Sequence, residues 1–205
     1  MALTSRLVVG TAAVVLSMAV LFTVPPGYFV AATFLATGCM VASAYSLGAL
    51  GTSRKASARA VAAGLLSALL LYLIFVAGAA GISAFHPFGM TAADEASIYA
   101  LITSSSTPSY LQVAVLLSDA AGFESFFRGV LQQKLTPRFG TASAFVVALF
   151  DAGIHAISLN PLWVGATFVT DLAWGLTFRY GGGKQASFVS HLIWDIAIFV
   201  VRPVT

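Results

Sequence analysis

Long apolar runs separated by short polar or proline- and glycine-containing breaks make up most of the chain. A membrane-spanning helix needs roughly 20 mostly apolar residues, and each run has about this length. The pattern therefore predicts seven spans. They cover approximately residues 7–24, 28–50, 60–83, 109–132, 141–158, 162–180 and 185–201. Pro137, Pro161 and the glycines at 181–183 mark breaks between the later spans.

One substantial segment, residues 84–108, is not apolar enough to lie in the membrane. Within it, Thr91 and Asp94 are spaced like a helix start, with a hydroxyl cap followed by an acid in the first turn. The spacing predicts a short surface helix in an extracytoplasmic loop.

Composition supports a membrane protein and limits its partners. Of the 205 residues, 59% are hydrophobic and 8% are charged, whereas soluble domains carry about 25% charged residues. We expect a single all-α, polytopic membrane domain over residues 1–205, in contact with the lipid bilayer. A net charge of +3 spread over short loops indicates no nucleic-acid partner. The single cysteine, Cys39, excludes an internal disulfide.

Basic residues predict the orientation. With seven alternating spans and a cytoplasmic N-terminus, nearly all lysines and arginines fall on the cytoplasmic side. The C-terminus is then extracytoplasmic, and we expect the cell membrane as the location. The basic residues placed inside are Arg6, Arg54, Lys55, Arg59, Lys134, Arg138, Arg179 and Lys184.

Ionisable residues inside the predicted spans are the candidate functional residues, because charge in a membrane is costly and usually faces the bundle interior. Three pairs have the i,i+4 spacing that places both members on one helix face. Two further acids, Asp119 and Asp171, lie in the same spans. The pairs are Glu124 with Arg128, Asp151 with His155, and His191 with Asp195.

Counting about 1.5 Å per helical residue puts these groups at one depth, with Glu124 about 15 Å from Lys134. We expect a water-filled pocket there, reached from the cytoplasmic side. Carboxylates and imidazoles in such a pocket can carry out acid–base chemistry and stabilise an oxyanion. Two histidines and a carboxylate also suit zinc, but no HExxH-type arrangement is present. The sequence therefore predicts no cofactor or metal, with zinc only weakly supported.

The motifs on these spans resemble those of the CPBP or Abi family of intramembrane endopeptidases, which includes CAAX prenyl endopeptidases and bacteriocin-processing proteins. That family carries EExxxR, FxxxH and HxxxN or HxxxD on successive helices. Here the segments Glu124–Gly129, Phe150–His155 and His191–Asp195 are similar to these motifs in order and interval. The resemblance places a CPBP-like core in residues 109–201 and leaves the three spans of residues 1–83 as a variable part.

The resemblance implies hydrolysis of a peptide bond in a membrane-associated or prenylated protein or peptide, near the cytoplasmic face and without a metal. It assigns Glu124, His155, His191 and Asp195 as catalytic residues. An acid would activate water, and the two histidines with Asp195 would stabilise the oxyanion. Phe123, however, occupies the position of the first Glu of EExxxR.

Other residues could support the catalytic residues, and their roles stay open at this point. Asp119 or Asp151 could replace the missing acid, and Arg128 could lock Glu124 into a structural ion pair. Asp171 matches no motif, and we expect it to be a hydrogen-bonding residue between helices.

Two alternative functions remain open at this point. A member without the leading Glu could be an inactive scaffold or a subunit of a membrane complex. A proton-coupled carrier would also use acids and histidines inside a membrane.

Overall fold

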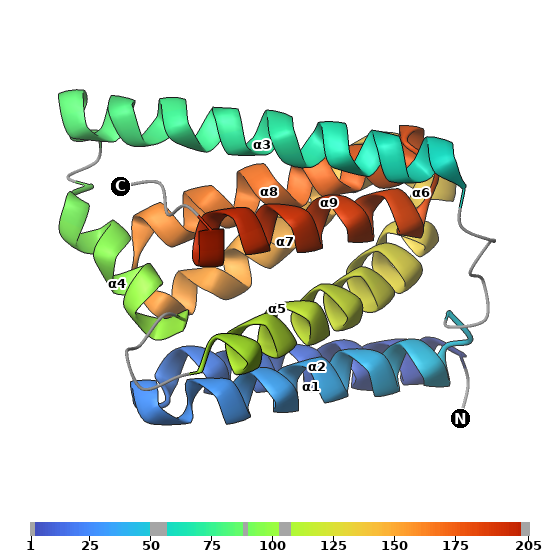
Figure 1. Ribbon diagram of the computed structural model, residues 1–205. Coiled ribbons are helices and arrows are strands. Elements are labelled where there is room, and N and C mark those ends of the chain that lie inside the picture. The colour runs from blue at the N-terminus through green and yellow to red at the C-terminus, as the bar shows by residue number, and fades with distance from the viewer. Residues whose placement is uncertain (1–2, 50–56, 88–89, 103–107, 202–205) are drawn as a thin grey trace.

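In the computed structural model, which describes residues 3–49, 57–87, 90–102 and 108–201, every regular element is helical. Most helices lie side by side, and successive long helices reverse direction (Figure 1). The prediction of an all-α, polytopic membrane bundle is confirmed.

The N-terminal part is built from three long helices. α1 spans Leu3–Thr23 and is followed by a short 3₁₀ turn, η1, at Pro26–Tyr28. α2 then covers Phe29–Ser46, and α3 covers Ala58–Phe85. These bounds agree closely with the first three predicted spans.

α4, at Ala92–Ile102, is the short helix that the sequence predicts between the third and fourth spans. Its first turn is stabilised as expected, because the Thr91 backbone N–H and hydroxyl both donate to Asp94 Oδ2, at 2.8 and 2.9 Å. The other parts of this predicted loop at residues 88–89 and 103–107 lie outside the described residues.

The C-terminal part begins with one continuous helical segment. α5, at Ser109–Phe123, passes directly into a π-helix, η4, at Glu124–Gln132 and then into α6, at Gln133–Phe139. Pro137 therefore lies inside a helix instead of ending one. The break comes at Gly140, whose φ of 54° is a backbone conformation that glycine adopts readily.

Three further helices complete the bundle. α7 covers Ala142–His155 and ends in the 3₁₀ turn η5, Ala156–Ser158. α8 spans Pro161–Tyr180, with Asn160 as its N-cap and proline at its first position. α9 runs over Lys184–Ile196 and continues as the π-helix η6, Ala197–Val201.

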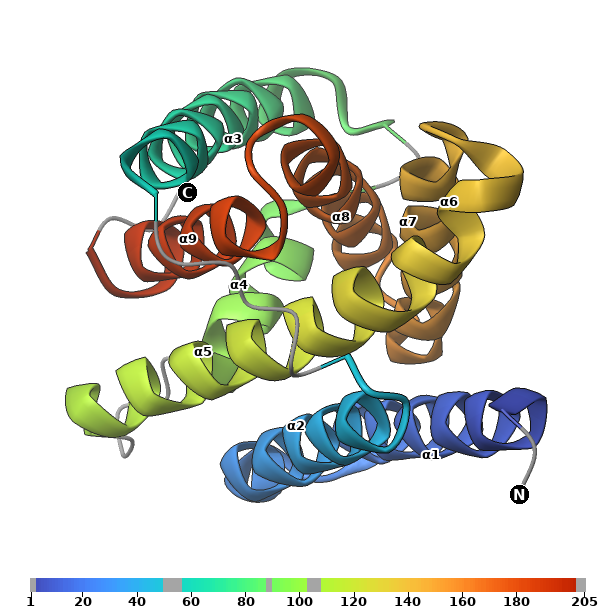
Figure 2. The same ribbon diagram turned by 90° about the vertical axis from the view of Figure 1, so that its right-hand side faces the viewer.

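Helices distant in sequence pack together to form the interior. α1 and α2 form a hairpin that packs against α5 through α2, and α3 lies along α9 (Figure 2). α7 packs on α8, which in turn contacts α9. Aromatic and aliphatic side chains from α1, α2, α3, α5, η4, α7, α8 and α9 contribute to the buried core.

The two ends of the bundle differ in charge. One end, here called the basic end, holds the N-terminal side of α1, the start of α3, α6 and the α8–α9 connection (Figure 1). The opposite end, the α4 end, holds the end of α3, α4 and the start of α8. The basic residues described at the basic end are Arg6, Arg59, Lys134, Arg138, Arg179 and Lys184. The other predicted inside residues, Arg54 and Lys55, lie outside the described residues.

Several helices are long and apolar enough to cross a membrane. Within the described ranges four meet this description, namely Leu3–Thr23, Pro26–Ser46, Ala58–Phe85 and Lys184–Val201, and Ala142–Ser158 is a shorter apolar helix. On α3 the exposed side chains include Leu66, Leu69, Leu70 and Leu73, an apolar surface suited to lipid. The count of seven spans stays a prediction, because the helical segment 109–139 and α8 carry charged residues that lower their apolarity.

Candidate functional site

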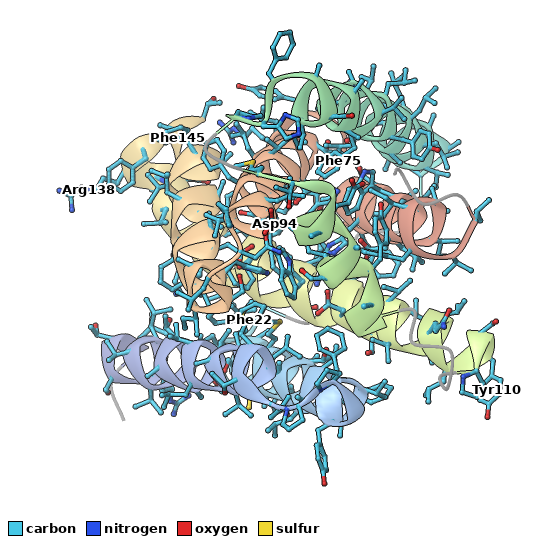
Figure 3. All side chains as sticks on the ribbon, turned by 90° about the vertical axis from the view of Figure 1, so that its left-hand side faces the viewer. Phe22, Phe75, Asp94, Tyr110, Arg138 and Phe145 are labelled. Carbon is cyan, nitrogen blue, oxygen red and sulfur yellow. The ribbon has the colours of Figure 1, made fainter. Side chains whose placement is uncertain are left out.

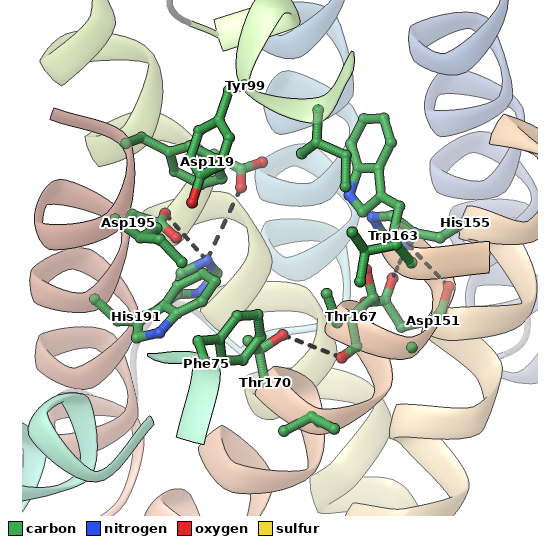
Figure 4. A pocket seen from close by; sticks show the side chains of 18 of the residues that line it. Phe75, Tyr99, Asp119, Asp151, His155, Trp163, Thr167, Thr170, His191 and Asp195 are labelled. Atoms are coloured by element: carbon green, nitrogen blue, oxygen red, sulfur yellow. Dashed lines mark hydrogen bonds and ion pairs between the residues drawn. The ribbon is translucent and has the colours of Figure 1, made fainter. Parts of the chain in front are cut away.

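A cavity of about 430 Å³ lies inside the bundle. Most of its wall is apolar or aromatic, and its polar lining includes five of the residues selected from the sequence. Figure 4 shows these on two sides of the cavity, with Asp119, His191 and Asp195 on one and Asp151 and His155 on the other. The structure thus brings together acids and imidazoles from α5, α7 and α9.

His191 is the central residue of the first side and is 3% exposed. Its Nδ1 lies 3.1 Å from Glu124 Oε1, and its Nε2 lies 3.5 Å from Asp195 Oδ2 and 4.0 Å from Asp119 Oδ2. An ionised carboxylate can only accept a hydrogen bond, so Nδ1 donates to Glu124. The Trp174 ring stacks on the imidazole at 3.6 Å and fixes its plane. The ring is therefore held with Nε2 facing two carboxylates.

His155 is held similarly on the other side. Its Nδ1 donates to the backbone carbonyl of Asp151 at 3.0 Å and lies 3.4 Å from Asp151 Oδ1. The rings of Phe22 and Trp163 lie against it, with centroid distances of 4.8 and 5.7 Å. The predicted pairing within α7 is confirmed, and Nε2 of His155 is left for another partner.

Glu124 does not line the cavity. It is 1% exposed, at the start of the π-helix η4, and contacts His191 from the side away from the cavity. π-helical turns often occur at functional sites. In this geometry Glu124 orients His191 and has no direct access to a substrate in the cavity.

Arg128 has a different main partner from the predicted one. Its Nε is 3.9 Å from Glu124 Oε2, whereas its terminal nitrogens bind the Asp171 carboxylate, the Asp171 backbone carbonyl at 3.1 Å, and Gln132 Oε1 at 2.9 Å. Gln132 in turn donates to the Gly175 carbonyl at 2.8 Å. We call Arg128, Gln132 and Asp171 the Arg128 cluster. Asp171 thus bonds between helices, as expected, and it is Arg128 that it binds.

Gly175 permits the close approach of helices around this cluster. A Cβ atom at this position would lie 2.8 Å from Ala144 Cβ on α7 and 3.2 Å from an Arg128 nitrogen. Because such a contact is too short, a larger residue would push α7 and α8 apart.

Phe123, at the position of the missing Glu, is 5% exposed and packed among aromatic rings. It stacks on Phe127 with centroids 4.1 Å apart and meets His191 edge-on at 5.2 Å. The cavity continues beside it toward Asp119, one turn closer to the α4 end. A water needs about 10–15 Å³ of such space, so the cavity that Phe123 and Asp119 line is large enough to hold water.

α4 is part of the cavity wall, which the sequence analysis did not anticipate. Seen from its own end of the bundle, α4 crosses the middle of the molecule, with Asp94 near the centre (Figure 3). Its residues Glu95, Ile98 and Tyr99 line the cavity. Burial raises the pKa of the Glu95 carboxyl above its usual range.

Asn160 fastens α4 to the bundle. Its side-chain amide donates to the Asp94 carbonyl at 2.9 Å and to Ser97 Oγ at 3.1 Å. Its side-chain oxygen accepts from the Trp163 backbone N–H at 3.1 Å and caps α8. Only the capping role has a sequence signal, namely an Asn directly before a proline.

The cavity does not extend toward the basic end. Its lining includes residues of α5, α7, α8, α9 and η6 and, from the other helices, the last turns of α1, residues 29–40 of α2, the second half of α3, and α4. These parts of α1, α3 and α4 lie toward the α4 end (Figure 1). The predicted access from the side of the basic residues does not match this cavity, because the Arg128 cluster fills the interior on that side.

The group with metal-ligating potential among the described residues is Asp119, His191 and Asp195. One ligand atom from each residue lies within 4.8 Å of the others. His155, the second histidine in the predicted zinc set, belongs to the opposite side of the cavity.

Part of the chain matches a known protein family. Residues 105–197 match the family model described as type II CAAX prenyl endopeptidase Rce1-like. The match covers slightly less than half of the chain, holds all three motifs, and confirms the resemblance drawn from them. No curated protein and no solved structure matches the chain.

Proposed function

We propose that the chain, whose residues 105–197 match the Rce1-like CAAX prenyl endopeptidases, is an intramembrane endopeptidase acting in the cavity between α5, α7 and α9. One observation carries the proposal. His191 is fixed by Glu124 through Nδ1 and presents Nε2 to a cavity that also holds two carboxylates. That arrangement supplies an acid–base group of set orientation beside space for water.

Some of these residues contact the reacting atoms, and others position the side chains that do. Asp119, the partly exposed carboxylate nearest Phe123, takes the water-activating role left open by the missing Glu. His155, His191 and Asp195 stabilise the tetrahedral oxyanion. Glu124 positions His191.

The substrate is a membrane-associated protein or peptide. The mostly apolar cavity wall suits an apolar segment or a lipid group, and the description of the matching family names a CAAX prenyl endopeptidase. Access from the α4 end would place the scissile bond in the half of the bundle that α4 covers.

The test compares protein termini in membranes of cells carrying wild-type, His191→Asn or His86→Asn protein at equal levels. His86 is exposed and outside the cavity, and its φ of 46° is tolerated by asparagine, so it is a matched control. We expect new termini with wild-type and His86→Asn, and a loss of about 10²–10⁴-fold in their formation with His191→Asn.

Identical profiles for all three proteins would contradict the proposal. An inactive scaffold would then be the better interpretation. Uptake that depends on the proton gradient would instead indicate a carrier.

A further inference from the structure

The wall of the cavity carries more negative than positive charge. Its acidic and basic side chains are four acids and two histidines, and no lysine or arginine in the described part of the chain lines it. Even with both histidines protonated, two negative charges remain. A low-dielectric wall with an excess of one charge sign concentrates the electric field, so the cavity attracts cations. The six side chains are Glu95, Asp119, Asp151, Asp195, His155 and His191.

Glu95 differs from the other acids of the wall because it has no partner. Asp151 contacts His155, and the two remaining acids approach the imidazole of His191. The Glu95 carboxyl forms no ion pair or hydrogen bond with any residue that the structure describes. A half-buried carboxylate without a partner is costly, and a bound cation removes that cost.

Glu95 is not required to start α4. Asp94 has that role, since its Oδ2 accepts from the Thr91 backbone N–H and hydroxyl at 2.8 and 2.9 Å. Asp94 does not line the cavity, whereas Glu95 lines it together with Ile98 and Tyr99. These follow Glu95 by three and four residues and therefore share its helix face. The two neighbouring acids of α4 thus have different surroundings, and only one of them belongs to the cavity.

Aromatic residues lie on the turns next to Glu95. Asn160 donates to the Asp94 carbonyl at 2.9 Å and accepts from the Trp163 backbone N–H at 3.1 Å, so the first turns of α4 and α8 meet. Tyr99 lies one turn further along α4, and its ring and that of Trp163 both line the cavity (Figure 4). The face of an aromatic ring attracts ammonium and guanidinium groups. A carboxylate near such rings suits an organic cation.

We propose that the cavity binds an organic cation, namely an ammonium or guanidinium group on an apolar body, with Glu95 as its counter-ion and Tyr99 and Trp163 beside it. The volume of about 430 Å³ lies within the usual range of ligand pockets, about 300–1,000 Å³. The mostly apolar remainder of the wall suits the hydrocarbon part of such a ligand. If the chain cleaves peptides, a point that rests on the proposed function, the cation is a Lys or Arg side chain of the substrate near the cleaved bond.

The first test uses the intrinsic fluorescence of the purified full-length protein in an uncharged detergent. The chain has three tryptophans, Trp163, Trp174 and Trp194, and all of them line the cavity. N-methylpyridinium is the cationic quencher, and acrylamide is the neutral one. We expect saturable quenching by N-methylpyridinium in the wild type. Glu95→Gln should weaken its binding about 3–10-fold, the loss expected on removing one charge of a partly buried ion pair, with acrylamide quenching unchanged.

Two further variants show whether the charge of Glu95 is responsible. Glu95→Asp keeps the carboxylate and should retain most of the binding. Asp94→Asn changes the neighbouring acid outside the cavity, keeps a side-chain oxygen for Thr91, and should bind like the wild type. Quenching by N-methylpyridinium that does not saturate in the wild type would overturn the proposal. Equal cation binding by wild type and Glu95→Gln would also overturn it, as would an equal loss in Asp94→Asn.

A second measurement extends the comparison of protein termini. New termini formed by the wild type should have Lys or Arg within a few residues of the cleaved bond, and Glu95→Gln should slow their formation by the same factor as it weakens binding. Cleaved sites without a nearby basic residue would overturn the assignment of the cation to the substrate. Cation binding without any cleavage would contradict the proposed function alone, whereas cleavage without cation binding would overturn this inference alone.

Discussion

The Arg128 cluster and the Asp119–His191–Asp195 group are both sets of ionisable residues inside the bundle, yet their environments differ. The terminal nitrogens of Arg128 bond to the Asp171 carboxylate, a backbone carbonyl and Gln132, and none of these three residues lines the cavity. Around His191 three acids share one imidazole, and two of them face a cavity. A cation paired with an acid away from any cavity stabilises a fold, whereas several acids that share one cation beside a cavity can bind and react. The pairing of charges and contact with the cavity separate these roles.

The largest expected effect comes from breaking the ion pair of the Arg128 cluster. Asp171→Asn leaves Arg128 buried without its main acid, and we expect the free energy of unfolding to fall by about 3–5 kcal/mol. Denaturant unfolding in detergent measures this.

The matched change in the cavity is Asp195→Asn, which should lower the free energy of unfolding by about 1 kcal/mol or less while impairing cleavage. If the two variants lost equal stability, the distinction between the two regions would not hold.

A smaller effect concerns helix packing around the Arg128 cluster. Gly175→Ala places a methyl group against Ala144 and should destabilise the protein by about 1–3 kcal/mol. Gly165→Ala on the same helix is the control, because a Cβ there has no neighbour within 4 Å. We expect this control to be neutral or slightly stabilising, and thermal unfolding of the two variants measures the difference.

Variants of Asn160 test whether this residue holds α4 against the cavity. Asn160→Ala removes a helix cap and both bonds to α4, and we expect a loss of about 0.5–2 kcal/mol with faster hydrogen exchange in α4. Asn160→Asp keeps the capping oxygen but cannot donate to Asp94 or Ser97. It should therefore retain α8 stability and still show faster exchange in α4. Unchanged exchange in both variants would mean that Asn160 does not hold α4.

The smallest expected effect is a pH dependence from Glu95. Burial raises the pKa of this carboxyl from its ordinary value of 4.5, so the folded state binds the proton more tightly than the unfolded state does. Stability from this group is complete below the unfolded pKa and is lost as pH rises through the folded pKa. Glu95→Gln should flatten this part of the stability–pH curve, as followed by Tm. A steeper curve in the variant would contradict the assignment.

Patterns within one helix could be predicted from the sequence. Apolar runs gave the long helices to within a few residues, and i,i+4 spacing gave the Asp151–His155 and His191–Asp195 contacts. Both depend on helix geometry alone, which is the same wherever the helix lies.

Contacts between helices could not be predicted in the same way. The Arg128–Asp171 pair joins residues 43 positions apart, and the Glu124–His191 contact joins residues 67 apart. Their partners depend on how η4, α8 and α9 pack. The inward position of α4 was missed for the same reason, since its lining residues are not marked by any motif.

The Arg128 cluster also has a consequence for the electrical integrity of the membrane. Acids and imidazoles at mid-depth can form a proton wire if water reaches them from both sides. Arg128 and Asp171 are 0% exposed and lie where η4 meets α7 and α8, between the cavity and the basic end. We expect this packing to block a continuous water path through the bundle, so that water could enter the cavity from one end without making the membrane leak protons.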